Sequence, residues 1–326
     1  MEYKPATIRM LSRLGPSGAL GMALAELGEE REEILALSAD MSDPSGLGKF
    51  RGKFPERHYN FGIAEQNAVS AAVGMALEGF VPFVTTYATF FAMRAADQIK
   101  MGLGYMRANV KLVGILGGLS AGLFGPTHLS IEDFACMRAI PNLTVLSPAD
   151  GLEILKCVRA AAELDGPVYI RLTGEAGMPG VHFEEYDFAI GKPVQLLEGE
   201  RVAIFATGAV CAQAVAAAKM VEEACGFCVS VFDVHTLKPL DMQTVWTAAQ
   251  KAELLVSVEE HNVCGGLGSV LSEGLSQKGG MPPLLRLGVN DVYPHAGSYA
   301  YLLHGCGLDA ESIAHSIQNR LKGELH

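Results

Sequence analysis

Short runs of β-branched and other apolar residues alternate with longer, alanine-rich stretches along most of the chain. The short runs have the length of buried strands, whereas the longer stretches repeat their apolar positions at helical spacing. This alternation is typical of mainly parallel sheets with helices on both faces, and it predicts an α/β fold. In the first half the predicted strands are residues 34–38, 82–86, 110–115, 143–146 and 168–172, and the predicted helices are residues 18–27, 65–77, 90–103, 131–137 and 151–162.

The alternation stops at residues 173–193, which are rich in glycine, proline and acidic residues, and then resumes. Such a segment indicates a linker between two units. We therefore expect two domains, residues 1–180 and residues 181–326, each with a mainly parallel sheet covered by helices. In the second half the predicted strands are residues 202–206, 228–233, 254–258 and 284–286, and the predicted helices are residues 210–224, 267–276 and 310–321.

Composition and charge narrow the class of protein. The 326 residues are 49% hydrophobic, which is enough to bury a sizeable core. The net charge is −11 and no basic run interrupts it, so we expect no nucleic-acid partner. The first residues lack the apolar core of a signal peptide, and the most apolar stretch, residues 202–218, is broken by Thr207, Gly208 and Gln213. We expect a cytoplasmic protein that does not enter a membrane.

A carboxylate stands at the start of a predicted helix, in the tract YNFGIAEQN at residues 59–67. By itself Glu65 is explained as a residue that compensates the helix dipole. Other tracts change that interpretation: LSADMS at residues 37–42, GPTH at residues 125–128 followed by RAIPN and PAD, and SVEEHNVCGGLG at residues 257–268. In this order and spacing they resemble the C-terminal half of transketolases over residues 16 to 320.

The resemblance implies a thiamine-diphosphate enzyme of which only one half is present. In this family the aminopyrimidine of the cofactor is held by one domain, and its diphosphate and Mg²⁺ by another that carries a Gly-Asp-Gly sequence. No such sequence occurs in this chain. The resemblance thus implies that the metal ligands lie on a partner, a transketolase N-terminal subunit, and that two copies of each chain form an α2β2 assembly, active only when complete.

The resemblance also assigns roles to single residues. Glu65 is placed at the pyrimidine ring nitrogen, where a partly desolvated carboxyl promotes formation of the reactive ylide. Tyr87 and Phe90 are placed beside the pyrimidine; without the resemblance, ordinary core packing would be the favoured explanation of aromatic residues at this spacing. His128 is placed at the substrate hydroxyls and oxyanion. Asp40 is placed near the thiazolium, with a turn-forming aspartate as the alternative.

The substrate half of the pattern departs from the family. Phe124 occupies the position of an acidic residue that contacts the donor hydroxyl, and Leu116 that of a histidine near the phosphate. Gly174 stands where an arginine is expected, although Arg171 lies three residues away, and no arginine near the N-terminus is in register. We therefore expect ketol transfer with an atypical sugar, such as a sulfonated or branched one, although xylulose 5-phosphate is not excluded.

Two other functions are compatible with parts of the pattern. One is a 2-oxo-acid dehydrogenase beta-like subunit, which shares the architecture but not the GPTH tract. The other is a non-catalytic structural or regulatory subunit, which would not need the set of Glu65, Phe90 and His128. The transketolase resemblance accounts for more of the chain than either.

Overall fold

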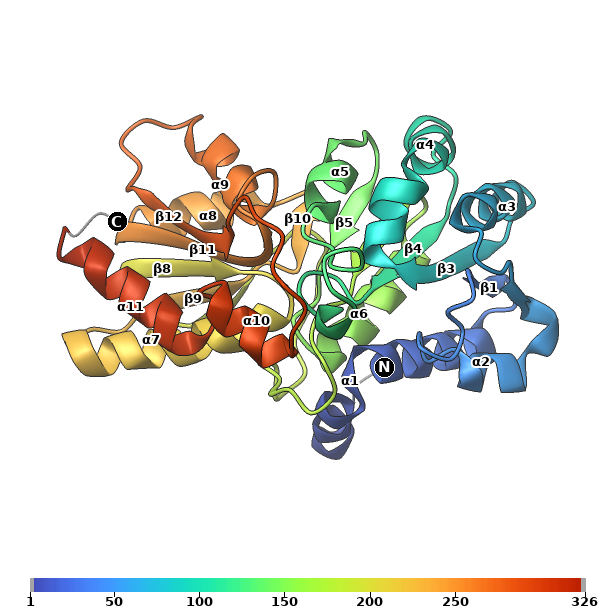
Figure 1. Cartoon of the computed structure of the whole chain (residues 1–326), viewed down its shortest axis with the longest axis horizontal. Coiled ribbons are helices and arrows are strands. Elements are labelled where there is room, and N and C mark those ends of the chain that lie inside the picture. The colour runs from blue at the N-terminus through green and yellow to red at the C-terminus, as the bar shows by residue number, and fades with distance from the viewer. Residues whose placement is uncertain (1–2, 324–326) are drawn as a thin grey trace.

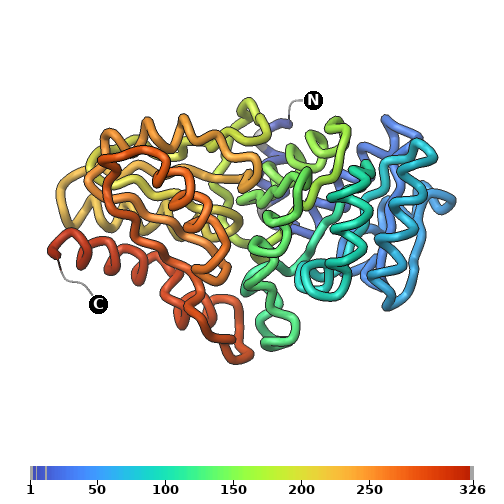
Figure 2. Tube along the Cα trace, turned by 90° about the horizontal axis from the view of Figure 1, so that it is seen from above, coloured from blue at the N-terminus to red at the C-terminus, as the bar shows by residue number. Residues whose placement is uncertain are grey.

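The computed structural model describes residues 3–323 and consists of two β-sheets placed end to end, each covered by helices (Figure 1). The first half of the chain occupies one end of the molecule and the second half the other (Figure 2). No described helix is long and apolar enough to cross a membrane. The predicted α/β fold with two mainly parallel sheets is confirmed.

The first sheet has the strand order β10-β5-β6-β4-β3-β1-β2, with every neighbouring pair parallel except β10 and β5. The carboxyl ends of its parallel strands therefore lie at one edge. Its strands are β1 (Ile34–Ser38), β2 (His58–Asn60), β3 (Val81–Tyr87), β4 (Lys111–Ile115), β5 (Thr144–Leu146), β6 (Val168–Arg171) and β10 (Thr236–Lys238).

Helices cover both faces of the first sheet (Figure 1). The helices α1, α2 and α6 lie on one face, and α3, α4 and α5 on the other. Their bounds are α1 (Pro5–Glu30), α2 (Gly48–Lys53), α3 (Glu65–Leu77), α4 (Ala96–Gln98), α5 (Asp133–Ala139) and α6 (Gly151–Glu163), with π-helical turns η2 (Phe90–Arg94) and η3 (Ile99–Tyr105) around α4 and 3-10 turns η1 (Pro55–Arg57) and η4 (Gly122–Phe124).

The second sheet has the order β12-β11-β8-β9-β7, with β7 antiparallel to its neighbour. Helices α7, α10 and α11 lie on one face and α8 and α9 on the other (Figure 1). The bounds are β7 (Val194–Leu197), β8 (Arg201–Ala206), η5 (Gly208–Val210), α7 (Cys211–Cys225), β9 (Ser230–Asp233), α8 (Met242–Ala249), β11 (Ala252–Asn262), α9 (Leu267–Leu275), β12 (Leu284–Val289), α10 (Tyr299–Gly305) and α11 (Ala310–Leu321).

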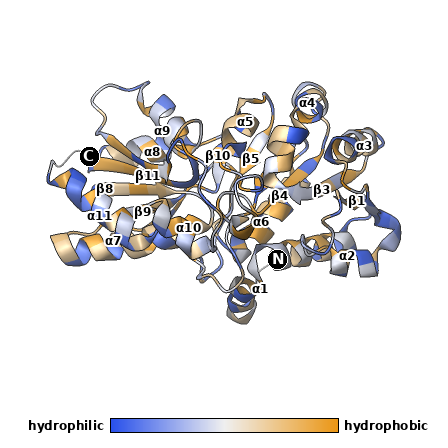
Figure 3. Cartoon of the chain, viewed as in Figure 1, coloured by the Kyte–Doolittle hydropathy of each residue, from blue (hydrophilic) through white to orange (hydrophobic). Residues whose placement is uncertain are grey.

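The central strands of both sheets are strongly hydrophobic, whereas outer helices such as α2 carry polar residues (Figure 3). One hydrophobic cluster continues from the first sheet to the second, from Phe134 and Tyr169 to Phe205 and Phe232. Burial of this shared apolar surface is favourable only while the two units are in contact. The two sheets therefore pack as one body.

The structure differs from the sequence-based prediction in several elements. Residues 90–103 form a broken series of π and α turns instead of one helix. The first helix starts at Pro5, with a kink where Gly15 has φ 71° before Pro16. The elements not predicted are β2, β7, β10, α2, α8 and α10.

Candidate active site at the carboxyl ends of β1 and β3

A cavity of about 400 Å³ opens beside the carboxyl ends of β1 and β3. Ligand sites of open parallel sheets lie at this edge, because the loops that follow the strands converge there. The structure brings together all five residues that the resemblance assigned to the cofactor and the chemistry. The cavity is lined by Ala39, Asp40, Met41, Ile63, Glu65, Thr86, Tyr87, Phe90, Arg94, Thr127 and His128.

Glu65 is the first residue of α3, and its side chain is only 2% exposed. Its Oε1 accepts a hydrogen bond of 2.8 Å from Nη1 of Arg94, while Oε2 is buried without a hydrogen-bond partner among the described residues. A buried carboxylate oxygen without a partner is costly. The free oxygen is therefore available to a hydrogen-bonding ligand in the cavity that Glu65 lines.

Aromatic rings form one wall of the cavity. The ring centroids of Tyr87 and Phe90 lie 5.4 Å apart, and that of His128 lies 5.4 Å from Tyr87 and 5.5 Å from Phe90. Burial raises the pKa of the Tyr87 hydroxyl above its usual range. Edge-on contacts of this kind fix the rings relative to one another, so that their apolar faces lie next to the polar Tyr87 hydroxyl and His128 imidazole. The wall suits a flat heteroaromatic ring.

Arg94 was not predicted as a site residue. Its guanidinium carbon lies 4.0 Å from the centre of the Phe90 ring, a distance typical of a cation–π contact, while the same group binds Glu65. The signal in the sequence was its spacing, because a residue four positions after Phe90 on a helix lies on the same side.

Asp40 follows β1 in a left-handed conformation, with φ 59°. Its backbone N–H donates to Oδ1 of Asn60 at 2.9 Å, and Asn60 Nδ2 donates to Asp40 Oδ1 at 3.3 Å. Asp and Asn tolerate this conformation better than other residues with a side chain. Asp40 therefore forms a turn and also lines the cavity, so the two interpretations are compatible.

His128 and Phe124 belong to the loop between β4 and α5. His128 is half-buried, and its Nδ1 lies 3.0 Å from the hydroxyl of Thr127. The ring of Phe124 is 59% exposed, with its centroid 5.5 Å from that of His128 and 6.2 Å from that of Tyr87. Phe124 thus stands beside the cavity next to His128.

The structure does not bring the other three substrate-pocket candidates to this cavity. Arg171 is fully buried, and its Nε donates to Oδ2 of Asp133 at 2.9 Å. Leu116, half-buried, packs against two hydrophobic clusters. Gly174, with φ 88°, lies close to Ala209. Each of these residues has a packing or backbone role in the described chain.

Among the described residues, one group of side chains has the spacing of a metal site: Glu153, His182 and Asp233. It lies away from the cavity and connects α6, the linker and β9. His182 Nε2 is 2.8 Å from Asp233 Oδ2 and 3.5 Å from Glu153 Oε1. Burial lowers the pKa of His182, but its hydrogen bonds to the carboxylates of Asp233 and Glu153 outweigh burial and raise this pKa to about 11. These ion pairs join the two domains.

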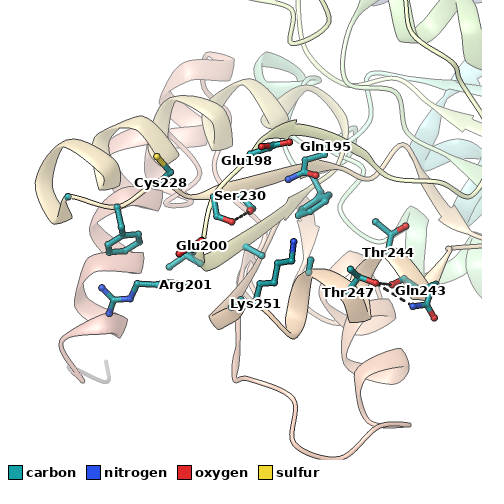
Figure 4. Close-up of a pocket in the computed structure, with 18 residues that line it drawn as sticks. Gln195, Glu198, Glu200, Arg201, Cys228, Ser230, Gln243, Thr244, Thr247 and Lys251 are labelled. Carbon is teal, nitrogen blue, oxygen red and sulfur yellow. Dashed lines mark hydrogen bonds between the residues drawn. The ribbon is translucent and has the colours of Figure 1, made fainter.

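A larger cavity, of about 1190 Å³, lies in the second domain (Figure 4). It adjoins Arg201, Ser230 and Ala252, the first residues of β8, β9 and β11, and so lies at the amino ends of these strands. Ligand sites of parallel sheets lie at the opposite edge. None of the residues that the resemblance assigned to the cofactor or the substrate lines it.

Comparison with known proteins identifies the family. The model of the transketolase pyrimidine binding domain matches residues 16–178, and that of the transketolase C-terminal domain matches residues 191–313. A protein of Methanocaldococcus jannaschii, provisionally named a transketolase C-terminal section, is 36% identical over 93% of this chain and 95% of its own. A 6-deoxy-6-sulfo-D-fructose transketolase subunit of Clostridium sp. (strain MSTE9) is 36% identical over 91% of this chain and 92% of its own.

A solved structure is similar over the same length. It is described as a split gene transketolase in the form of an inactive beta4 tetramer, and it shares 39% identity and a TM-score of 0.84. The alignment covers 93% of this chain and 97% of that one. With matching domain models, relatives of equal length and a common fold, the chain belongs to the transketolase family, of which it represents the C-terminal half.

Proposed function

We propose that this chain is the C-terminal subunit of a split transketolase, which transfers a ketol unit from a ketose donor to an aldose acceptor through thiamine diphosphate. The observation that carries the proposal is the free, buried Oε2 of Glu65 at the wall formed by Tyr87, Phe90 and His128. A carboxyl group can share a proton with a ring nitrogen and an aromatic wall can pack against a flat ring, so both features suit an aminopyrimidine.

The residues of the cavity fit the pyrimidine half of the cofactor. When bound, thiamine diphosphate supplies the acidic thiazolium carbon at which the donor is cleaved. Glu65 Oε2 would share a proton with the ring nitrogen, while Arg94 holds Oε1 in place. Tyr87 and Phe90 would flank the ring and exclude water, and the carboxylate of Asp40 would face the cationic thiazolium.

His128 is the residue best placed to act on the sugar. Its imidazole lies against Tyr87 and Phe90, and Thr127 holds its Nδ1 side, which leaves Nε2 for a ligand. A histidine in this position can donate to a developing oxyanion and move a proton from a hydroxyl group of the donor. A purely structural subunit has no need for a buried carboxylate oxygen without a partner in the same cavity as such a histidine.

The ligands of Mg²⁺ and the diphosphate are proposed to lie on a partner, a transketolase N-terminal subunit. Exposed apolar side chains around the cavity support a covering partner: Ile63 is 78% exposed, Met93 53% and Leu123 80%. Apolar surface gathered at one place commonly marks an interface. The split-gene relative is described as an inactive beta4 tetramer, which supports the proposal that this chain is inactive alone. By analogy with transketolase dimers, whose cofactors lie at subunit interfaces, we propose that it acts in an α2β2 assembly.

The donor is proposed to differ from an ordinary phosphoketose. Phe124 supports this proposal most directly, because it replaces an acidic group with an apolar ring beside His128. Leu116 and Gly174, which do not reach the cavity, support it less. One relative is named for a sulfonated ketose, which shows that related subunits exist for modified sugars.

The test combines the purified chain with the N-terminal subunit from the same genome, thiamine diphosphate and Mg²⁺. Deuterium exchange at the thiazolium carbon is followed by NMR, and ketol transfer is assayed with a panel of ketose donors. We expect exchange and transfer in the mixture but weak cofactor binding and no turnover with this chain alone. Tight, Mg²⁺-dependent cofactor binding by the isolated chain would contradict the split arrangement.

A further inference from the structure

The loop that carries His128 begins after strand β4 and ends before helix α5. It is closed at its base by a pair of backbone hydrogen bonds, of 2.9 Å from Gly118 N to Ser130 O and of 3.1 Å from Ser130 N to Gly118 O. Phe124 and His128 are therefore held on a closed loop, residues 118–130, and their position depends on what supports that loop.

The apolar side chains of this loop are buried in the core of the second domain. Leu119, Ala121 and Leu129 are each at most 1% exposed and belong to the hydrophobic cluster of β8, β11, α7 and α10. Ile131, the residue after the loop, belongs to the same cluster and is 2% exposed. Burying such side chains stabilises the loop by about 1 to 3 kcal/mol each, so the loop folds against the second domain.

A buried carboxylate adds a directional support. Glu260, near the end of β11, accepts a hydrogen bond of 3.2 Å from the backbone N–H of Leu119 at Oε2 and one of 2.6 Å from the hydroxyl of Tyr299 at Oε1. Arg171 Nη2 donates both to Ser130 O at 2.9 Å and to Glu260 O at 2.7 Å. The start of the loop thus bonds directly to Glu260 of the second domain, and the end of the loop is linked to Glu260 through Arg171.

The far end of the loop has its own contact with the second domain. The backbone N–H of Gly297, just before α10, donates to the carbonyl of Gly122 at 3.1 Å. A Cβ on Gly122 would lie 2.4 Å from the carbonyl oxygen of Gly297, so only glycine permits this approach. Figure 2 shows the loop, in green, beside the red segment near residue 297.

From these contacts we propose that the second domain sets the position of the active-site loop, and that Glu260 and Tyr299 are positioning residues for His128 and Phe124. The proposal rests on the proposed ketol transfer, and it gives the second domain a part in that reaction. Glu260 and Tyr299 act through the loop and touch neither cofactor nor substrate. Glu65 belongs to α3 and should be unaffected by them.

The first test changes Tyr299 to Phe, which removes the hydroxyl but keeps the ring in the core. Tyr301→Phe is the matched control, because Tyr301 lies on the same helix and is 62% exposed. In the isolated chain we expect faster hydrogen–deuterium exchange of the peptide spanning residues 117–131 in Tyr299→Phe only. In the assembled enzyme we expect kcat for the donor to fall about tenfold or more, since small displacements of a catalytic group are costly.

The second test displaces the loop by steric contact. Gly122→Ala forces it away from Gly297, while Gly52→Ala, where a Cβ meets nothing within 4 Å, is the control. The readout that separates positioning from general damage is exchange at the thiazolium carbon, which depends on Glu65. We expect this exchange to stay within about twofold of wild type in both loop variants while donor turnover falls.

The outcomes separate this inference from the proposed function. Normal turnover and normal loop protection in both Tyr299→Phe and Gly122→Ala overturn the inference, as does an equal fall in thiazolium exchange and turnover in a variant with unchanged Tm. If one variant fails to fold, the other decides. A wild-type assembly with neither exchange nor transfer overturns the proposed function instead, and loop protection in the isolated chain still tests the support by the second domain.

Discussion

Arg94 holds one oxygen of Glu65 through a 2.8 Å hydrogen bond and leaves the other oxygen free and buried. The guanidinium carbon also lies 4.0 Å from the centre of the Phe90 ring, so Arg94 contacts both the carboxylate and the aromatic wall of the cavity. A carboxylate held at one oxygen has little freedom to rotate. This pair presents a single, oriented acceptor to whatever ring binds in the cavity.

Changing Arg94 to Met should slow deuterium exchange at the thiazolium carbon about tenfold or more in the assembled enzyme. Loss of a charge-assisted hydrogen bond costs about 1.5 to 3 kcal/mol, and the freed carboxyl loses its orientation. Lys100→Met, which removes an exposed cation from the neighbouring turn η3, is the control. Equal exchange rates in the two variants would show that Arg94 has no part in orienting Glu65.

Changing Glu65 to Gln should lower that exchange and turnover by orders of magnitude and leave assembly intact. The amide resembles the carboxyl in shape but cannot share a proton with a ring nitrogen. Exchange is measured by NMR and assembly by light scattering, with Glu78→Gln, an exposed position at the end of α3, as the control. Wild-type exchange in the Glu65 variant would remove this residue from its proposed role.

Changing Phe124 to Asp should raise kcat/KM for xylulose 5-phosphate and lower it for the natural donor. A carboxylate beside His128 can accept from a donor hydroxyl, and one such hydrogen bond corresponds to about a tenfold effect or more. Leu123→Asp introduces the same charge at the neighbouring residue, which is 80% exposed, and should leave the ratio unchanged. A wild-type kcat/KM for xylulose 5-phosphate already above about 10⁴ M⁻¹s⁻¹ would contradict an atypical donor.

His182 should make the stability of the chain depend on pH. Because its pKa is about 11 when folded and 6.5 as the ordinary value, the folded state keeps a proton that the unfolded state loses. Its contribution is therefore complete below about pH 6.5 and declines as the pH rises towards 11, by at most about 1.4 kcal/mol per pH unit. The difference in Tm between wild type and His182→Gln should shrink from pH 6.5 to 10. His315→Gln, on the surface of α11, should show no such trend.

The assembly with the N-terminal subunit should have the mass of two copies of each chain. Each copy of this chain contributes 34.6 kDa, and two cavities of this kind, covered by two partners, give two complete sites. Multi-angle light scattering of the purified complex measures this mass. A stable and active one-to-one complex would contradict the α2β2 arrangement.

The sequence was sufficient to locate most strands and the cavity residues, for reasons visible in the structure. β1 and α3 have the predicted bounds because buried parallel strands and their helices leave clear apolar periods. Asp40 closely follows β1 and Glu65 begins α3, so these two residues could be expected to lie near each other once the strands were known. His128 lies within the long loop between β4 and α5, and only the GPTH tract pointed to it. The resemblance then supplied the proposed roles.

The parts that were missed depend on contacts between distant segments. β10 is three residues long, and only its pairing with β5, some 90 residues earlier in the chain, makes it a strand. Arg171 was expected near the substrate, but its ion pair with the buried Asp133 becomes visible only when β6 and α5 pack together. The support of the His128 loop by Glu260 likewise has no local signal.

The pairing of β10 with β5 has a consequence for the solubility of fragments. β5 would otherwise be an edge strand, with a row of free backbone donors and acceptors ready to pair with another chain, and such edges promote aggregation. Lys238, the last residue of β10, adds a contact that holds β10 against the first sheet, since its Nζ donates to the carbonyl of Arg138 at 3.0 Å. A fragment that stops within the linker would lose this cover and expose the hydrophobic side chains beneath it. The first sheet therefore depends on the second domain as a guard against intermolecular β-pairing.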